Sequence, residues 1–263
     1  MTGGPNREQS CPPPPGLAGK VGVVITAVDE TWSLRETVDV LLADNPDAIG
    51  EIMIGIAPRT TVECRAVIAE LEAAHPHLVR HHEQAALPGA GGANRECIAL
   101  MRSPWLLLMA ADLETHPGTA ASMIARAGSG DVDIVATSRW LGGSRFGDYP
   151  PVKRVCNGLF QRLFSRLYGA RLTDMTFGYR LYRARELTRY AWRETGHAFF
   201  FETLVKPLRC GARVAEVGTH WRKRREGTTH MPELEYLRYV KIGLSTRVRP
   251  ASRLLAASKG DAH

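Results

Sequence analysis

The sequence predicts an α/β protein built on a doubly wound, mainly parallel sheet. Apolar runs of strand length alternate with amphipathic segments of helical period along the first half of the chain. The connecting loops are short, and this alternation is typical of parallel sheets whose ligands bind beyond the carboxyl ends of the strands. The chain has 263 residues, 44% of them hydrophobic, which suffices for one sizeable core. Disordered and fibrous classes are therefore excluded.

The first strands and helices are marked by apolar runs and capping residues. A buried strand is predicted at 21–27. Ser33 and Glu36 have the spacing of a capping box that opens a helix. The run 51–56 predicts a second strand, and the threonines that open 60–74 predict the N-terminus of a second helix. We therefore expect two strand-helix units before residue 75.

The same alternation continues to about residue 137. A short strand is predicted near 78–80 and a helix over 92–101. The apolar run 105–111 predicts a buried strand, since it is much shorter than the roughly 20 residues that span a bilayer. A further strand is predicted at 133–137.

Both ends of the chain differ from its centre. Residues 1–18 are rich in proline and lack apolar periodicity, which predicts a disordered leader. A single folded domain is predicted over 19–232. Residues 151–168 form a predicted amphipathic helix with a basic face, and 233–263 is predicted to hold a second such helix, to about residue 248, and a flexible tail. Such helices pack on a sheet or lie on a membrane surface.

Charge and cysteine usage narrow the class of partner. The net charge is +7, but the chain from Arg139 onward holds 25 basic and 10 acidic residues. This half is expected to face an anionic partner, such as phosphate groups, a lipid surface or nucleic acid. The five cysteines are scattered without metal spacing, and no signal peptide precedes them. A reduced, cytoplasmic location is the expectation.

The strongest local signal for chemistry is a pair of carboxylates after the strand at 105. Asp112 and Glu114 follow it directly, and residues spaced by two in an extended chain point the same way. Carboxylate oxygens suit Mg²⁺ or Mn²⁺, which bind one or two carboxylates together with substrate phosphates. The alternative is that Asp112 caps the next helix.

Several motifs then resemble glycosyltransferase family 2 of the A-type (Rossmann-like) fold, in particular dolichol-phosphate mannose synthases and related polyprenyl-phosphate glycosyltransferases. Residues 24–30 resemble the nucleotide-binding loop V-I-P-A-Y-N-E, and 89–94 resemble a glycine-rich turn before a helix. Residues 110–114 stand in the place of the metal motif D-A-D-L-Q. Residues 174–180 resemble D-x-T-S-G-F-R, and 224–230 resemble R-x-x-G-x-S-K. The order of these motifs covers roughly residues 20–230.

The resemblance implies an inverting transfer of a sugar from a nucleoside diphosphate sugar to a phosphate acceptor, with Mg²⁺ or Mn²⁺ held by Asp112 and Glu114. The acceptor is expected to be polyprenyl phosphate or a smaller phosphorylated, specialised metabolite. It implies Asp112, Arg180 and Asp174 as catalytic residues, with Asp174 orienting Arg180 or a sugar hydroxyl. The implied donor-binding residues are Thr26, Val28, Glu30, Gly89, Gly91, Ala111 and Arg139. The implied acceptor or diphosphate residues are Thr176, Glu202, Arg224, Arg225, Thr229 and His230.

The chain departs from the family pattern mainly at donor positions. Residues 55–61 carry no carboxylate where the family has D-D-G-S-T-D, so that Arg59 is a candidate contact for a phosphate or an unusual donor. Ala110 replaces the first Asp of the metal motif, while Glu114 replaces its Gln. His230 replaces the terminal Lys, which would make the charge of that loop pH dependent near a pKa of about 6.5.

Three readings follow. The first is an active glycosyltransferase with altered donor preference, which contacts the inner face of a membrane peripherally. The second is a glycosyltransferase-like protein that has lost catalysis and serves as a binding or regulatory partner. A nucleic-acid-binding role is disfavoured, since no known nucleic-acid module is found.

Overall fold

The computed structural model describes residues 17–141, 151–224, 226–227 and 235–256. Its strands are β1 (Val21–Thr26), β2 (Ile49–Ile56), β3 (Val79–Glu83), β4 (Trp105–Ala110), β5 (Ile134–Ser138), β6 (Arg180–Arg183) and β7 (Val214–Gly218). Its helices are α1 (Trp32–Asp44), α2 (Val62–Ala74), α3 (Gly89–Leu100), α4 (Thr119–Gly128), α5 (Pro151–Tyr168), α6 (Arg185–Thr188), α7 (Ala198–Arg209) and α8 (Glu235–Val248), and a 3-10 turn spans Ala251–Leu254.

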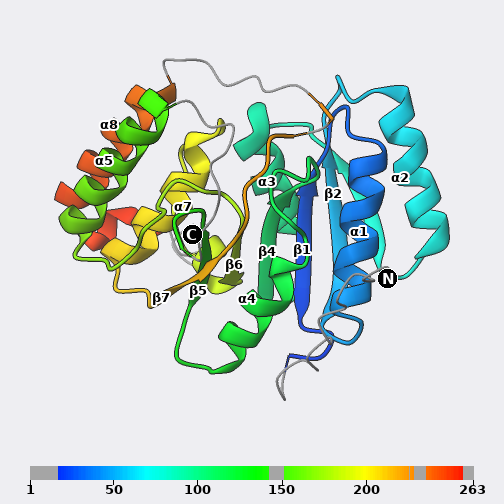
Figure 1. Cartoon of the computed structure of the whole chain (residues 1–263), viewed down its shortest axis with the longest axis horizontal. Coiled ribbons are helices and arrows are strands. Elements are labelled where there is room, and N and C mark those ends of the chain that lie inside the picture. Colours follow the sequence, from blue (N-terminus) through cyan, green and yellow to red (C-terminus); the bar gives the residue numbers. More distant parts are fainter. Residues whose placement is uncertain (1–16, 142–150, 225, 228–234, 257–263) are drawn as a thin grey trace, which may run out of the picture.

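The strands form one sheet in the order β3-β2-β1-β4-β6-β5-β7. β6 runs antiparallel to β4 and β5, and the other pairs are parallel. The chain runs outward from β1 to β3 and then returns to β4 on the other side of β1. The predicted doubly wound, mainly parallel sheet is thus confirmed, and its strand order reverses between β1 and β4 (Figure 1).

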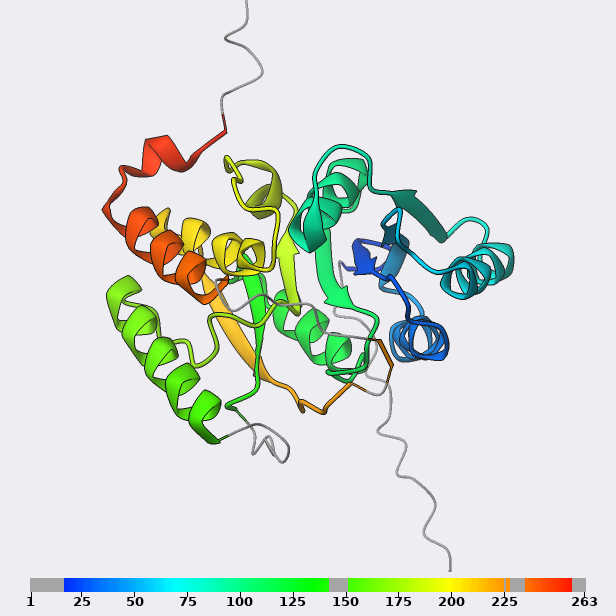
Figure 2. The ribbon, with the colours of Figure 1, turned by 90° about the horizontal axis from the view of Figure 1, so that it is seen from above.

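Helices cover both faces of this sheet. One apolar cluster joins alternate residues of β1, such as Val23 and Ile25, to α1, α2 and α4. A second cluster joins the opposite side of the strands, such as Val24 and Leu108, to α3, α6 and α7. A third lies among α5, α7 and α8 at one end of the molecule, as Figures 1 and 2 show. The alternation follows from the period of two in a strand.

Several predicted elements agree with the structure and a few do not. The helix predicted at 151–168 coincides with α5. The capping box at Ser33 and Glu36 is wrong, because α1 begins at Trp32 and its N-cap Thr31 makes no side-chain capping bond. The helix predicted from residue 92 begins at Gly89 instead, so that the glycine-rich turn forms its first turn.

The ends of the chain are described only in part. The predicted leader lies almost wholly outside the described residues, and the division at residue 232 stays a prediction. α8 packs against α7, and the Tyr168 hydroxyl of α5 donates to the Gly243 carbonyl at 2.7 Å. Among the described residues, no helix is long and apolar enough to span a bilayer.

Candidate active site

A cavity of about 790 Å³ lies at the carboxyl edge of β1, β2 and β4. This is the edge at which the strand order reverses and at which ligands bind in open α/β sheets. Its wall is formed by Thr26, Ala27, Val28, Glu30, Gly55, Ile56, Ala57, Pro58, Arg59, Gln84, Ala85, Ala86, Leu87, Pro88, Gly89, Ala90, Ala93, Ala110, Asp112, Gly196, His197 and Arg224. Of the candidate site residues named from the sequence, the wall contains Thr26, Val28, Glu30, Arg59, Gly89, Asp112 and Arg224.

Two carboxylates and one guanidinium meet beside this cavity. The Arg224 side chain reaches Asp112 Oδ2 at 2.9 Å and Glu114 Oε1 at 3.0 Å. Leu113, between the two acids, has φ 53°, so the segment is not extended as predicted. The backbone turn instead lets the Glu114 N–H donate to Asp112 Oδ1 at 3.1 Å. Asp112 and Glu114 therefore converge on the Arg224 guanidinium, although a turn and not an extended segment brings them together.

Asp112 does not cap the next helix. α4 begins at Thr119, and its N-cap Gly118 makes no side-chain capping bond. Asp112 is 7% exposed, and that exposed part faces the cavity. The capping alternative is therefore excluded.

The surroundings of Asp112 favour its protonated form. Burial is the largest cause and the Glu114 carboxylate adds to it, and together they raise the pKa of Asp112 to about 6 against the opposing effect of Arg224. Burial lowers the pKa of Arg224, but Asp112 and Glu114 outweigh burial and raise it. A pKa of about 6 still leaves most Asp112 side chains ionised at neutral pH, and a cation beside this carboxylate stabilises its charged form.

Two further carboxylates shape the wall of the cavity. Glu30 Oε2 accepts from the N–H of Val28 at 2.7 Å and of Asp29 at 3.2 Å, which fixes the loop after β1. Glu96 of α3 accepts from the three successive N–H groups of 85–87 at 2.6 to 2.9 Å. Burial raises the pKa of Glu96, but these N–H groups and His82 outweigh it and lower the pKa to about 2.

The glycine-rich turn allows α3 to approach a distant segment closely. A Cβ on Gly91 would lie 2.5 Å from Phe199 Cβ and 2.6 Å from the Gly196 carbonyl. Gly89 has φ 76°, a region that favours glycine, and its Cβ would lie 2.6 Å from the Thr195 carbonyl. Gly91 therefore does not line the cavity but holds one of its walls in place.

Arg180 lies in the core and not at the cavity. It is fully buried in β6, where its guanidinium donates to the carbonyls of Met175, at 2.7 Å, and of Phe200. β6 is the fifth strand of the seven-stranded order, with β4 and β5 on either side, so a side chain from it points into a helix-covered layer. This geometry gives Arg180 a structural role in place of the expected catalytic one. Ala111 is likewise a core residue with no contact to the cavity.

Asp174 orients Arg139 and not Arg180. Its carboxylate accepts from Arg139 Nε at 2.7 Å and from the second guanidinium nitrogen at 3.0 Å. Thr176 and Gln161 join this buried network at 2.8 Å from each other, and none of the four residues lines the cavity. The expected pairing with Arg180 is therefore wrong, since the two groups belong to different hydrogen-bond networks.

The remaining acceptor residues are placed in part. Glu202 is buried in α7, where it forms an ion pair with Lys206 at 2.6 Å and accepts from the N–H groups of 193–194. This gives Glu202 a structural role away from the cavity. Arg225, Thr229 and His230 lie outside the described residues.

Some residues at the site gave no signal in the sequence. Gly196 and His197 enter the wall from the start of α7, and Glu96 acts on it from α3. Glu226 accepts hydrogen bonds from Thr31 and Ser33 at the start of α1. These contacts join segments far apart in the chain, and only the packed fold reveals them. Arg59 lines the cavity as the departure from the family pattern suggests, and no ion pair of its side chain is found in the described part of the chain.

The comparison with known structures agrees with this fold. The chain resembles glucosyl-3-phosphoglycerate synthase of Mycobacterium tuberculosis in complex with Mn²⁺, UDP and phosphoglyceric acid, with 15% identity, a TM-score of 0.65, and coverage of 88% of this chain and 79% of the other. A complex of that enzyme with Mn²⁺, UDP-Glc and phosphoglyceric acid gives 16% identity and a TM-score of 0.65 over 88% and 80% of the two chains. A protein described only as mycobacterial gives 20% identity and a TM-score of 0.66 over 88% and 76%.

The family itself follows from the sequence. The model of glycosyl transferase family 2 matches residues 23–190, which include most of β1, all of β2 to β6 and the carboxylates at 112 and 114. This match covers more than half of the chain, and the solved structures above share its A-type-like fold. The chain therefore belongs to glycosyl transferase family 2 and is a nucleotide-sugar glycosyltransferase.

Proposed function

We propose that the chain transfers a sugar from a nucleoside diphosphate sugar to the phosphate of an acceptor, with inversion at the anomeric carbon. The observation that carries the proposal is the convergence of Asp112, Glu114 and Arg224 beside a cavity at the strand-order reversal. Support also comes from one of the similar structures, glucosyl-3-phosphoglycerate synthase in complex with UDP-Glc and phosphoglyceric acid. Both the leaving diphosphate and the acceptor phosphate in such a reaction are anionic, and the cavity wall offers them the guanidinium groups of Arg59 and Arg224.

A divalent cation at Asp112 and Glu114 fits the side chains present. A guanidinium already bridges the two carboxylates, at 2.9 and 3.0 Å, so the pair presents its oxygens to a cation. Within the described residues, no three His, Cys, Asp or Glu side chains are grouped to enclose a metal. This suits Mg²⁺ or Mn²⁺, which bind one or two carboxylates and complete their shells with water and phosphate oxygens. When bound, the ion neutralises charge that develops on the departing diphosphate.

Side chains of the cavity bind the donor and stabilise the negative charge of its phosphates. Arg224 is placed to donate two parallel hydrogen bonds to a phosphate, as guanidinium groups do well. Glu30 and Glu96 fix the two loops between which the nucleoside lies. The acceptor phosphate is anionic at neutral pH, since its second pKa is about 6, and it needs no general base.

The acceptor in this proposal is a phosphate, carried either by a polyprenyl lipid or by a small metabolite. Resemblance of motifs to dolichol-phosphate mannose synthases favours the lipid, while some of the similar solved structures contain phosphoglyceric acid and one contains glycerol 3-phosphate. The phosphate is common to both.

Support for a lipid surface comes from two helices at one end of the molecule. On α5, Val155, Leu159 and Leu163 recur every four residues and are each about 60% exposed. On α8, an apolar stripe that includes Leu237 and Val248 is also exposed. The described residues 154–168 and 237–256 carry eight basic side chains and no carboxylate. Two copies of this basic face would repel each other, whereas an anionic lipid surface would attract it. We therefore infer peripheral contact with an anionic membrane.

Product analysis tests the proposed reaction. The full chain is incubated with UDP-, GDP- and dTDP-sugars, Mn²⁺, and either a polyprenyl phosphate or 3-phosphoglycerate, and products are identified by mass. A sugar phosphodiester is expected for one pair, because transfer to the acceptor phosphate gives this linkage with either acceptor. No product with any pair, together with no nucleotide binding, would contradict the proposal. Flotation with phosphatidylglycerol vesicles tests the membrane contact separately, with Leu159→Glu expected to reduce it.

A further inference from the structure

The segment after β7 crosses the carboxyl edge of the sheet. Its described residues, 221–224 and 226–227, are called the strap here. Figure 1 shows it running from β7 over the ends of the central strands toward α1. Trp221 pairs with Thr115 through a β-bridge, and the Arg222 N–H donates to the Glu114 carbonyl at 2.8 Å. The first half of the strap is thus fixed to the loop that carries the two site carboxylates.

The second half of the strap is fixed to α1 by one carboxylate. Glu226 accepts from Thr31 Oγ1 at 2.5 Å, from the Ser33 N–H at 3.1 Å and from Ser33 Oγ at 2.7 Å. The N-terminus of a helix has free N–H groups and favours negative charge. α1 has neither a capping side chain at Thr31 nor an acid in its first turn. Glu226 therefore provides its N-terminal acceptor from 193 residues away.

The end of the strap, at Gly227, lies very close to the loop after β1. Gly227 has φ 80°, and a Cβ on it would lie 2.9 Å from Asp29 Oδ1 and 3.3 Å from Glu30 Oε1. Close approach of this kind requires glycine in the left-handed region. Glu226 and Gly227 together thus close the strap against the wall of the cavity, with Arg224 held between two attachment points.

We propose that Glu226 is a positioning residue that acts through Arg224. This inference rests on the proposed function. With both ends of the strap fixed, the Arg224 guanidinium is confined near the site carboxylates, where the donor diphosphate binds. Without Glu226, the strap is held on one side only, and binding must order Arg224 at the expense of its conformational entropy. α1 itself packs through Leu34, Val38 and Leu41, so the fold does not depend on this contact.

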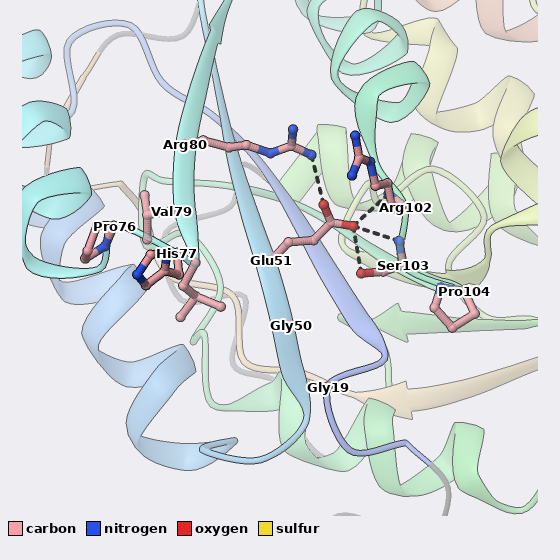
Figure 3. A pocket seen from close by; sticks show the side chains of 11 residues that line it. Gly19, Gly50, Glu51, Pro76, His77, Val79, Arg80, Arg102, Ser103 and Pro104 are labelled. Carbon is pink, nitrogen blue, oxygen red and sulfur yellow. Dashed lines mark hydrogen bonds and ion pairs between the residues drawn. The ribbon is translucent and has the colours of Figure 1, made fainter.

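A matched carboxylate lies at the opposite edge of the sheet. Glu51 of β2 borders a second cavity of about 480 Å³ and accepts from Arg80, from the N–H groups of Arg102 and Ser103, and from Ser103 Oγ (Figure 3). Like Glu226, it joins separate segments through several hydrogen bonds, but it lies at the other ends of the strands. Glu51→Gln is therefore the control for loss of an anchoring carboxylate.

The test is a double-mutant cycle with UDP and Mn²⁺ as the probe. Affinities are measured by calorimetry for the wild type, Glu226→Ala, Arg224→Ala and the double variant. We expect Glu226→Ala to weaken UDP binding about tenfold and the double variant to bind no more weakly than Arg224→Ala alone. Glu226→Gln keeps an oxygen acceptor for the Ser33 N–H and should restore part of the affinity. Glu51→Gln should bind UDP like the wild type.

Two results would overturn the proposal. Effects of the two single substitutions that multiply in the double variant would show that Glu226 does not act through Arg224, and wild-type affinity in Glu226→Ala would show that it has no role in binding. Should the wild type bind no nucleotide, the proposed function fails. Limited trypsin cleavage within 222–225 then tests separately whether Glu226 fixes the strap. If it does, Glu226→Ala should be cut faster than the wild type, and Glu51→Gln should not.

Discussion

The two edges of the sheet each place a carboxylate beside an arginine, yet the partners differ in origin. At the amino edge, Glu51 takes its partners from residues 29 to 52 positions away, and four of its hydrogen bonds come from Arg80, Arg102 and Ser103. At the carboxyl edge, Arg224 reaches Glu114 from 110 positions away and through a strap that a second remote contact holds. At the amino edge the contacts join segments that are at most 52 residues apart, whereas the site at the carboxyl edge joins segments that are more than 100 residues apart.

This difference in partners indicates which of the two ion pairs can be replaced by contacts to a ligand. Glu51 has main-chain donors that no ligand can replace without unfolding the loop. Asp112 and Glu114 share mainly one guanidinium, which lines the cavity and is 21% exposed. A phosphate and a divalent cation can take over both halves of that pair. The following predictions are ordered by the size of the expected effect.

Asp112→Asn tests the carboxyl edge most severely. The substitution removes one of two carboxylates for the cation, and we expect turnover to fall about a hundred- to a thousandfold. The measurement is the rate of product formation with the donor and acceptor that the screen identifies. Glu51→Gln serves as the control and should retain its rate. Full activity in Asp112→Asn would contradict the catalytic role of the carboxyl edge, since neither carboxylate would then be needed for turnover.

Arg224→Lys asks whether geometry or charge matters at the strap. Lysine keeps the charge but cannot donate in parallel to two oxygens, so we expect about tenfold weaker UDP binding. Calorimetry in the presence of Mn²⁺ measures it. Unchanged affinity in this variant would reduce Arg224 to a point charge.

Gly91→Ala tests the assembly of the cavity from remote segments. The added Cβ would lie 2.5 Å from Phe199 Cβ, and we expect a loss of about 1 to 3 kcal/mol in the free energy of unfolding. Urea denaturation measures this loss. Gly158→Ala in α5 is the control, since its Cβ would meet Trp140 at an ordinary 3.5 Å. Equal stability of the two variants would contradict the close packing at α3.

Glu51→Gln is expected to have the smallest effect, and it depends on pH. Burial raises the pKa of Glu51, but hydrogen bonds from Ser103 and Arg102 and the charge of Arg80 outweigh it and lower the pKa below 4.5. A lowered carboxyl pKa stabilises the fold above pH 4.5, and this contribution is lost as the pH falls through the folded-state value. We expect a loss of about 1 kcal/mol at pH 7 that shrinks below pH 4.5. Urea denaturation across pH measures it, and a difference that grows toward acid pH would be the wrong sign.

Much of the fold followed from local patterns in the sequence. Apolar runs predicted β1, β2, β4 and β5 to within about two residues, because a strand buried on both faces leaves a continuous apolar signature. β6 and β7 escaped prediction, since β6 is only four residues long and β7 is only half-buried, so that neither leaves a long apolar run.

The site was predictable where it lies in one motif and not where it joins several. Asp112 and Glu114 belong to a single motif after β4, and both meet Arg224. Asp174 was expected to orient Arg180 of the same motif or a sugar hydroxyl, but β6 carries Arg180 into a buried layer and Asp174 pairs with Arg139. The contact between Glu226 and α1 has no local signature, because it depends on how β7 directs the strap.

The most direct test of the account is the affinity of the full chain for UDP with and without Mn²⁺, in the wild type and in Asp112→Asn. A site formed by Asp112, Glu114 and Arg224 predicts binding that Mn²⁺ strengthens in the wild type and leaves unchanged in the variant. Binding by the wild type that is indifferent to Mn²⁺, or equal strengthening in Asp112→Asn, would contradict the account.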